Sequence, residues 1–160
     1  MTDPARPLAV EAARVAPRAR QTLYPEPFAT QMKGRIKRQL GEVFGLTNFG
    51  VNLTRMSPGG VSAVRHSHGR QDELIYVLEG EPTLVTNAGE TLLKPGMCAG
   101  FKAGTGDAHH LINRSDREVV YLEIGDRMPG DTVVYPDQDL AARLGADGQW
   151  TYTHKDGRPY

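Results

Sequence analysis

Short apolar or alternating stretches, each ended by turn-forming residues, dominate positions 49–124 and constrain the fold more than any other feature. The first, 49–56, alternates between apolar and polar residues and stops at Ser57-Pro58-Gly59-Gly60, which predicts a half-buried strand followed by a turn. Further strands are expected at 83–86, 90–93, 97–101, 109–113 and 118–124. Short strands at such close spacing predict an all-β sandwich or barrel.

Two histidines and a glutamate stand close together within residues 60–81. His66 and His68 are two positions apart, and Glu73 follows five positions later. Side chains two apart on a strand share a face, so both imidazoles can reach one ion, and a turn through 69–71 can bring Glu73 back to it. This spacing predicts a metal site. The alternative is a pair of surface histidines beside a solvated carboxylate.

The strand expected at 73–78 is apolar on both faces apart from its one carboxylate. One face carries Glu73, Ile75 and Val77, and the other carries Leu74, Tyr76 and Leu78. We therefore expect this strand to be covered on both sides. A charged glutamate in that setting costs free energy unless it is paired or binds a cation.

A second stretch, 89–113, adds His109 four residues before Asn113. Together the two stretches resemble the cupin family, and the resemblance covers 48–125. Its first motif is matched by Gly60, His66, His68, Glu73 and Gly80, and its second by Gly89, Pro95, Gly96, His109 and Asn113.

The resemblance implies a jelly-roll barrel, or double-stranded β-helix, like that of small single-domain bacterial cupins. It implies that His66, His68, Glu73 and His109 bind one metal ion per chain. Many cupins pair through a sheet, and the strand at 73–78 has a second apolar face that one core cannot cover, so we expect a homodimer.

Three imidazoles and one carboxylate suit a divalent transition metal: Fe, Mn, Co, Ni, Cu or Zn. Calcium and magnesium prefer shells made entirely of oxygen, so they are disfavoured. Four protein ligands in an octahedral site leave two positions open for water, substrate or dioxygen. A closed, structural zinc site is the alternative, although such sites are usually rich in cysteine.

Other polar residues are given lesser roles. His110 should face away from His109, because neighbours on a strand point in opposite directions. Asn113 is expected to hydrogen-bond within the barrel, Cys98 to be a small buried residue, and His154 to lie at the surface. The possible acids or bases are Tyr76, Tyr121 and Glu123, and alternation does not decide whether Tyr121 and Glu123 face inward.

The flanks carry no motif. Five prolines in residues 1–30 disfavour a long helix, so this segment is expected to be an extended arm, partly disordered or packed on a partner subunit, with at most a short helix at 8–16. Residues 31–160 then form one cupin domain. Asp137 can cap a short helix that ends at Leu144, before a last strand at 150–153.

Composition excludes several classes of protein. The net charge is zero, and although residues 1–40 hold eight Lys or Arg against three Asp or Glu, no basic face or recognition helix follows, so we expect no nucleic-acid partner. No apolar run is long enough for a membrane span or a signal peptide. The single cysteine requires no oxidising compartment, so a cytoplasmic location is expected.

Two functions fit these observations. The first is an enzyme that acts on a small organic acid, phenolic or sugar-like substrate, as the dioxygenases, decarboxylases, lyases and isomerases of the cupin family do. The second is a non-catalytic, metal-dependent protein that binds or senses a small molecule. Fold and motif alone do not fix a reaction.

Overall fold

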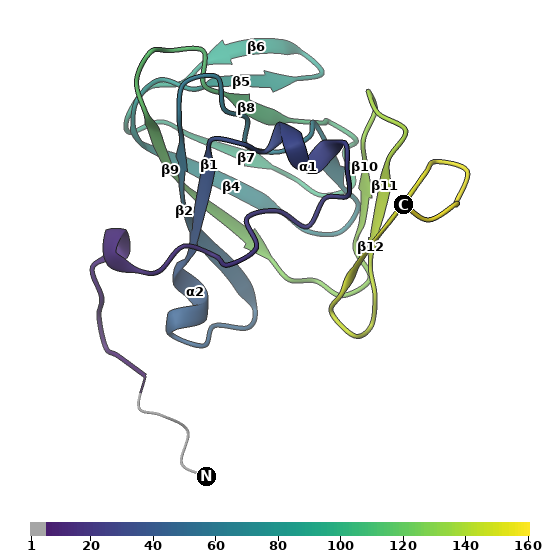
Figure 1. The fold of residues 1–160 in the computed structure, drawn as a ribbon, viewed down its shortest axis with the longest axis horizontal. Coiled ribbons are helices and arrows are strands. Elements are labelled where there is room, and N and C mark those ends of the chain that lie inside the picture. Colours follow the sequence, from purple (N-terminus) through teal and green to yellow (C-terminus); the bar gives the residue numbers. More distant parts are fainter. Residues whose placement is uncertain (1–5) are drawn as a thin grey trace.

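The computed structural model describes residues 6–160 and shows an antiparallel β barrel with two short helices (Figure 1). The helices are α1 (Phe28–Gln31) and α2 (Leu40–Val43), and a 3-10 turn covers Ala12–Arg14. The strands are β1 (Arg35–Gln39), β2 (Phe49–Met56), β3 (Ser67–His68), β4 (Glu73–Glu79), β5 (Thr83–Thr86), β6 (Gly89–Leu92), β7 (Cys98–Phe101), β8 (His110–Ile112), β9 (Val119–Asp126), β10 (Thr132–Val134), β11 (Ala141–Leu144) and β12 (Trp150–Thr153).

The largest sheet has the strand order β1-β2-β9-β4-β7. At its centre, β2 pairs with β9 along its whole length, and β4 lies between β9 and β7. There are two smaller sheets, β6-β5-β8 and β12-β11-β10-β3; in Figure 1 the teal β5–β6 hairpin of the first lies apart from the yellow-green strands β10, β11 and β12 of the second. The predicted all-β jelly-roll barrel is confirmed.

The main core lies between the five-stranded sheet and the β6-β5-β8 sheet. Val77 on β4 and Tyr121 on β9 are fully buried there, and Leu84 and Leu111 pack against them from β5 and β8. Inward and outward residues alternate along β4, because successive side chains of a strand point to opposite faces. This alternation turns Glu73 toward the same interior as Ile75 and Val77.

The N-terminal arm lies along the barrel of its own chain. The Arg18 amide donates to the Lys37 carbonyl over 2.8 Å, and the Lys37 amide donates to Oε1 of Gln21 over 3.0 Å, so the arm follows β1. Further on, Phe28 of α1 packs into a second apolar cluster behind β10 and β11. Packing on a partner subunit stays a prediction, and residues 1–5 lie outside the described part of the chain.

Two predictions about secondary structure need correction. Residues 137–144 do not form a helix: Ala141–Leu144 is the strand β11, which pairs with β10 on one side and with β12 on the other. Burial of Leu140 and Ala142 outweighs the local capping signal of Asp137, whose carboxylate instead pairs with Arg65. The expected helix at 8–16 is reduced to one 3-10 turn.

The outward face of β4 is not covered within the chain, although the sequence predicts a covered strand. Leu74, Tyr76 and Leu78 are each about 40% exposed. Cys98 pairs with Tyr76 in the ladder and shares this face, so the prediction that Cys98 is buried is wrong. Within 6–160, no helix is long and apolar enough to cross a membrane.

Candidate metal centre

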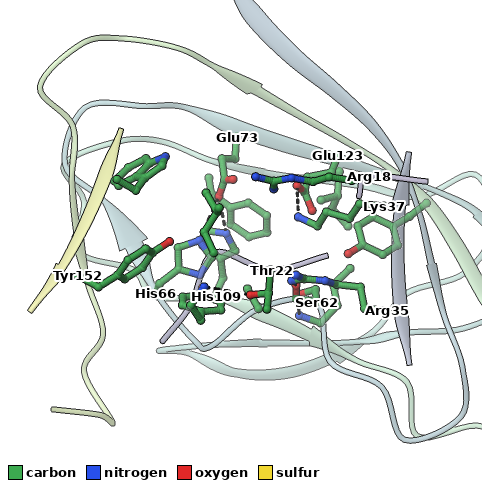
Figure 2. Close-up of a pocket in the computed structure, with 18 residues that line it drawn as sticks. Arg18, Thr22, Arg35, Lys37, Ser62, His66, Glu73, His109, Glu123 and Tyr152 are labelled. Atoms are coloured by element: carbon green, nitrogen blue, oxygen red, sulfur yellow. Dashed lines mark hydrogen bonds and ion pairs between the residues drawn. The ribbon is translucent and has the colours of Figure 1, made fainter. Parts of the chain in front are cut away.

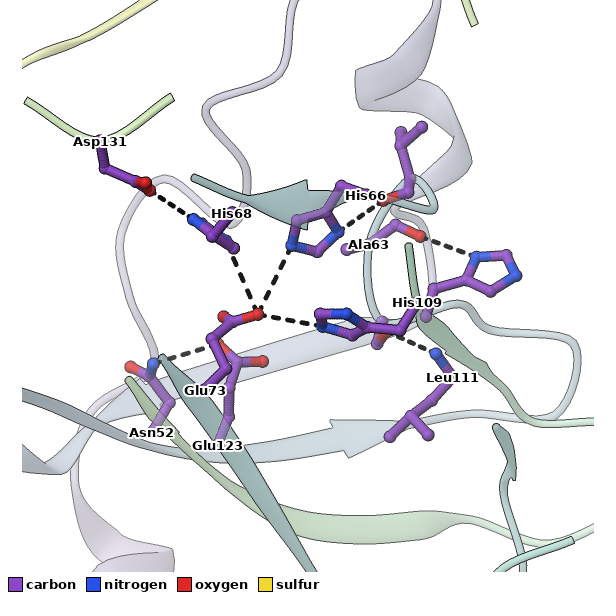
Figure 3. Close-up of polar contacts among 12 residues, drawn as sticks. Asn52, Ala63, His66, His68, Glu73, His109, Leu111, Glu123 and Asp131 are labelled. Atoms are coloured by element: carbon purple, nitrogen blue, oxygen red, sulfur yellow. Dashed lines mark hydrogen bonds and ion pairs between the residues drawn. The ribbon is translucent and has the colours of Figure 1, made fainter. Parts of the chain in front are cut away.

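The four residues singled out by sequence lie at or directly before the ends of strands, and their side chains converge (Figure 3). Glu73 is the first residue of β4, and His68 is the last residue of β3. His66 and His109 form an isolated antiparallel bridge, in which each amide donates to the carbonyl of the other, over 3.1 and 2.8 Å. The backbone therefore fixes the positions of both residues.

All three imidazoles direct Nε2 toward one carboxylate oxygen. The distances from Oε2 of Glu73 are 3.0 Å to His109, 3.6 Å to His68 and 3.7 Å to His66. The ligand atoms of His66, His68 and Glu73 all lie within 4.8 Å of one another. This convergence can hold a metal ion. That all four residues bind the same ion stays a prediction.

Hydrogen bonds at the opposite ring nitrogens set the tautomers of two histidines. Nδ1 of His66 lies 2.8 Å from the Val64 carbonyl, which can only accept, so Nδ1 carries the hydrogen. Nδ1 of His68 lies 2.5 Å from Oδ2 of Asp131, a fully buried carboxylate that also accepts the Arg70 amide over 2.7 Å. Both arrangements leave the Nε2 lone pair free to bind a cation.

His109 is positioned by stacking. Its ring lies parallel to that of Phe101, with an interplanar angle of 2° and 3.4 Å between centroids. Its Nδ1 is buried and has no hydrogen-bond partner among residues 6–160, while its Nε2 faces Glu73. Packing therefore orients this imidazole, whereas hydrogen bonds orient the other two.

The protonation states of His66 and Glu73 favour a cation. Burial lowers the pKa of His66 to about 3, so this ring is neutral at physiological pH. Burial alone would raise the pKa of Glu73, but the hydrogen bond with His109 and the charges of the other imidazoles lower it. Burial would also lower the pKa of His68, but the hydrogen bond with Asp131 and the charge of Glu73 raise it. An ionised carboxylate among imidazoles fits a divalent transition metal.

The cluster opens into a cavity of about 160 Å³, shown in Figure 2. A wider cleft of about 550 Å³ shares part of this lining, including His66, Glu73 and Glu123. Aromatic rings of Tyr24, Trp150 and Tyr152 line both spaces. A small polar metabolite can thus reach the cluster through a space lined by both aromatic and polar side chains.

A partly buried ion pair lies in the wall of the same cavity. Nζ of Lys37 on β1 lies 2.5 Å from Oε1 of Glu123 on β9, and the two side chains are only 15% and 19% exposed. Nδ2 of Asn52, on the strand between them, donates to the same oxygen over 3.3 Å. Burial lowers the pKa of Lys37, and the charge of Glu123 only partly opposes this shift.

The structure shows which way the side chains of Tyr121 and Glu123 face, which alternation in the sequence does not decide. Glu123 and Tyr121 both face inward, and Tyr121 is fully buried, whereas Tyr76 faces outward. His110 turns away from the cluster, as predicted, and its Nδ1 contacts the Ala63 carbonyl at 3.1 Å. Asn113 is fully buried and has a structural role, because its Nδ2 donates to two backbone carbonyls. His154, the fifth histidine, pairs with Asp139 near the surface.

Sequence reasoning missed two of these residues. Asp131 follows the turn Pro129-Gly130, where no alternating pattern indicates which way its side chain points. Lys37 lies in a flank that carries no motif. Their partners are distant in sequence, at His68 and Glu123, so only the folded barrel brings them together.

The antiparallel barrel and its histidine and glutamate cluster define the class of protein, and comparisons with known proteins agree. The Cupin domain family matches residues 52–125. The chain belongs to the cupin superfamily. Among curated proteins, none matches the sequence.

Two solved structures resemble nearly the whole chain. One is a sugar phosphate isomerase of the cupin superfamily from Silicibacter pomeroyi, with 38% identity and a TM-score of 0.89, over 95% of this chain and 96% of that one. The other is a putative sugar phosphate isomerase from Acidithiobacillus ferrooxidans, with 28% identity and a TM-score of 0.70, over 89% and 98% of the two chains.

A more distant structure shares only the fold. It is a polyketide cyclase from Streptomyces resistomycificus, with 21% identity and a TM-score of 0.61, over 74% of this chain and 78% of that one.

Proposed function

We propose that this protein is a metal-dependent isomerase that interconverts the aldose and ketose forms of a small phosphorylated sugar. One observation carries the proposal: His66, Glu73 and His109 of the metal cluster and the partly buried Lys37–Glu123 pair line a single cavity (Figure 2). Aldose–ketose isomerisation needs both a group that polarises a carbonyl and a base that moves a proton on carbon. The names of the two structures similar along the whole chain support the same substrate class.

The metal would be held by His66, His68, Glu73 and His109. A bound divalent ion supplies Lewis-acid polarisation of the sugar carbonyl and its neighbouring hydroxyl. Asp131 and the Val64 carbonyl keep two of the imidazoles in the tautomer that this role requires.

Glu123 is the proposed base. Its carboxylate takes the proton from the carbon next to the carbonyl, the C–H electron pair forms the enediol double bond, and the carboxylic acid then returns the proton to the former carbonyl carbon. A hydroxyl proton passes between the two sugar oxygens. Substrate and product are isomers, so no oxidant or reductant is needed. The Lys37 ammonium donates to the Glu123 carboxylate and fixes its orientation.

Isotope exchange tests this proposal. In D₂O, the protein loaded with zinc or manganese should isomerise one of the pentose 5-phosphates or hexose 6-phosphates, and proton NMR should show deuterium entering the product carbon. Glu123→Gln should lower turnover by about 10²- to 10⁴-fold, as removal of a general base does, without loss of bound metal. Glu118→Gln is the matched control, because Glu118 pairs with Arg55 at the surface.

Two outcomes contradict the isomerase. If no metal form converts or exchanges any sugar phosphate, yet a metabolite at a hundred times its dissociation constant stabilises the protein by about 2.7 kcal/mol, the protein is a non-catalytic binder. If iron-loaded protein consumes oxygen with an organic acid or a phenol while the zinc form is inactive, it is an oxygenase. An activity that Glu123→Gln leaves intact would remove Glu123 from the mechanism.

A further inference from the structure

We propose that the N-terminal arm completes the metal cavity, and that Arg18 on this arm binds the phosphate group of the substrate. The identity of the anion as a phosphate rests on the proposed function. The role of the arm in binding an anion rests on the contacts and charges described next.

The arm is a fixed wall of the cavity. Besides the two hydrogen bonds that align it with β1, Nη2 of Arg35 donates to the Gln21 carbonyl over 2.8 Å. Nη1 of Arg35 donates to the carbonyl of Ser62, a barrel residue that also lines the cavity, so one guanidinium joins the arm to the barrel. Arg18, Thr22 and Tyr24 of the arm all line the cavity beside His66 and Glu73.

Positive charge exceeds negative charge in this lining. Its charged side chains are three cations, Arg18, Arg35 and Lys37, and two carboxylates, Glu73 and Glu123. Lys37 pairs with Glu123, whereas Arg35 is only 6% exposed and donates to backbone carbonyls and a methionine sulfur rather than to a carboxylate. The Nε atom of Arg35 is buried and has no partner in the described part of the chain.

Arg18 is the cation that remains available. Its side chain is half-buried, and across residues 6–160 its guanidinium makes no hydrogen bond or ion pair, although its backbone is tied to β1. A cation held in a cavity wall without a partner favours an anionic ligand. A bound metal ion would increase the positive charge further.

The chemistry of the guanidinium favours phosphate. Arginine presents a planar fork of N–H donors that matches two oxygens of a phosphate, and such charge-assisted pairs are stronger than neutral hydrogen bonds. In Figure 2, Arg18, Lys37 and Glu123 are drawn on one side of the cavity and Tyr152 on the other, with Glu73 and the imidazoles between them. A sugar with its carbonyl at the metal cluster can therefore extend its phosphate toward the arm.

Calorimetry with inorganic phosphate tests this inference on the full-length protein as purified, with equal metal content verified in every variant. Arg18→Gln should weaken phosphate binding by about tenfold or more, the usual effect of losing one hydrogen-bonded charge. Arg18→Lys should restore part of the affinity, because it keeps the charge without the fork. Arg14→Gln is the matched control, since Arg14 lies on the exposed part of the arm and pairs with Glu11.

The inference is overturned if the parent does not bind phosphate, or if Arg18→Gln binds phosphate as tightly as the parent. It is also overturned if Arg18→Gln and Arg14→Gln lose the same affinity for phosphate, or if malonate binds more tightly than phosphate in an Arg18-dependent way. Unfolding temperatures should be equal in all variants, because the Arg18 side chain makes no intramolecular bond within 6–160; a large drop for Arg18→Gln would assign it a structural role instead. Arg18-dependent phosphate binding without sugar turnover would refute only the isomerase, and turnover with an unchanged KM in Arg18→Gln would refute only the phosphate site.

Discussion

The contact between Asp131 and His68 allows a sharp test of how the cluster is held. The two oxygens of Asp131 accept from two donors, Nδ1 of His68 and the amide of Arg70. In Asp131→Asn only one oxygen remains, and the new NH₂ group must face the other donor. If the Arg70 amide keeps the oxygen, the NH₂ group donates to Nδ1 of His68. The imidazole hydrogen then moves to Nε2, the atom that should bind the metal.

The magnitude follows from this change of tautomer. Loss of a carboxylate that orients a metal-binding imidazole typically lowers metal affinity by about 10- to 100-fold. That factor corresponds to about 1.4 to 2.8 kcal/mol of binding free energy. The metal-free protein should also lose about 1 to 3 kcal/mol of unfolding free energy, because neutral hydrogen bonds replace the stronger charge-assisted bonds of the fully buried Asp131 carboxylate.

Competition with a chelator measures the loss of zinc affinity, and urea unfolding of the metal-free protein measures the loss of unfolding free energy. The matched control is Asp139→Asn. Asp139 accepts from Nδ1 of His154 over 2.8 Å and from the Lys155 amide over 2.9 Å, which is the same arrangement at the surface and away from the cluster. The reasoning is refuted if Asp131→Asn binds zinc as tightly as the parent, or if Asp139→Asn loses as much affinity.

Three further predictions concern the metal, Lys37 and the assembly. His66→Ala and His109→Ala should each lose bound metal, while His154→Ala should keep it. Acid competes for the imidazoles, so the parent should begin to release metal somewhat below pH of about 6.5. Full metal occupancy at pH of about 4 would contradict histidine ligation. Because burial lowers the pKa of Lys37, isomerase activity should decline with rising pH at a pH below the free-lysine pKa of about 10.4. Lys37→Arg should move this decline to higher pH. A pH profile that Lys37→Arg leaves unchanged would exclude Lys37 as the cause of the decline. Tyr76→Glu should convert the expected homodimer into monomers in sedimentation at micromolar concentration, and a monomeric parent would contradict the dimer.

The fold could be predicted where sequence signals are local. Neighbouring residues determine the alternation along 49–56 and 73–79 and the turns that end these stretches. The corresponding strands β2 and β4 form as expected. Strand β11 shows the limit of this reasoning. Its sequence can cap and form a helix locally, but pairing with two neighbouring strands and burial of Ala142 decide its conformation.

The candidate site also contains residues that local sequence signals predict and residues that they do not. His66, His68 and Glu73 lie within eight consecutive positions, so their convergence could be predicted from sequence alone, although β3 pairs with β10 and β4 pairs with β7 and β9 rather than with β3. Asp131 reaches His68 across 63 positions, and Lys37 reaches Glu123 across 86. Contacts over such separations depend on the order of strands in the sheets, which no local pattern specifies.

The position of the N-terminal arm has a consequence for how such proteins acquire new specificities. A fragment cut at the limits of the family match, 52–125, would retain the metal cluster and Glu123 but not Arg18, Lys37 or Asp131. The metal ligands and the proposed base thus lie in one continuous segment, and the arm with the proposed anion-binding residue Arg18 lies outside it. Mutant libraries confined to 15–24 should diversify the accepted anion while leaving the metal cluster intact, and a bulky fusion placed directly before this segment should disturb substrate binding sooner than folding.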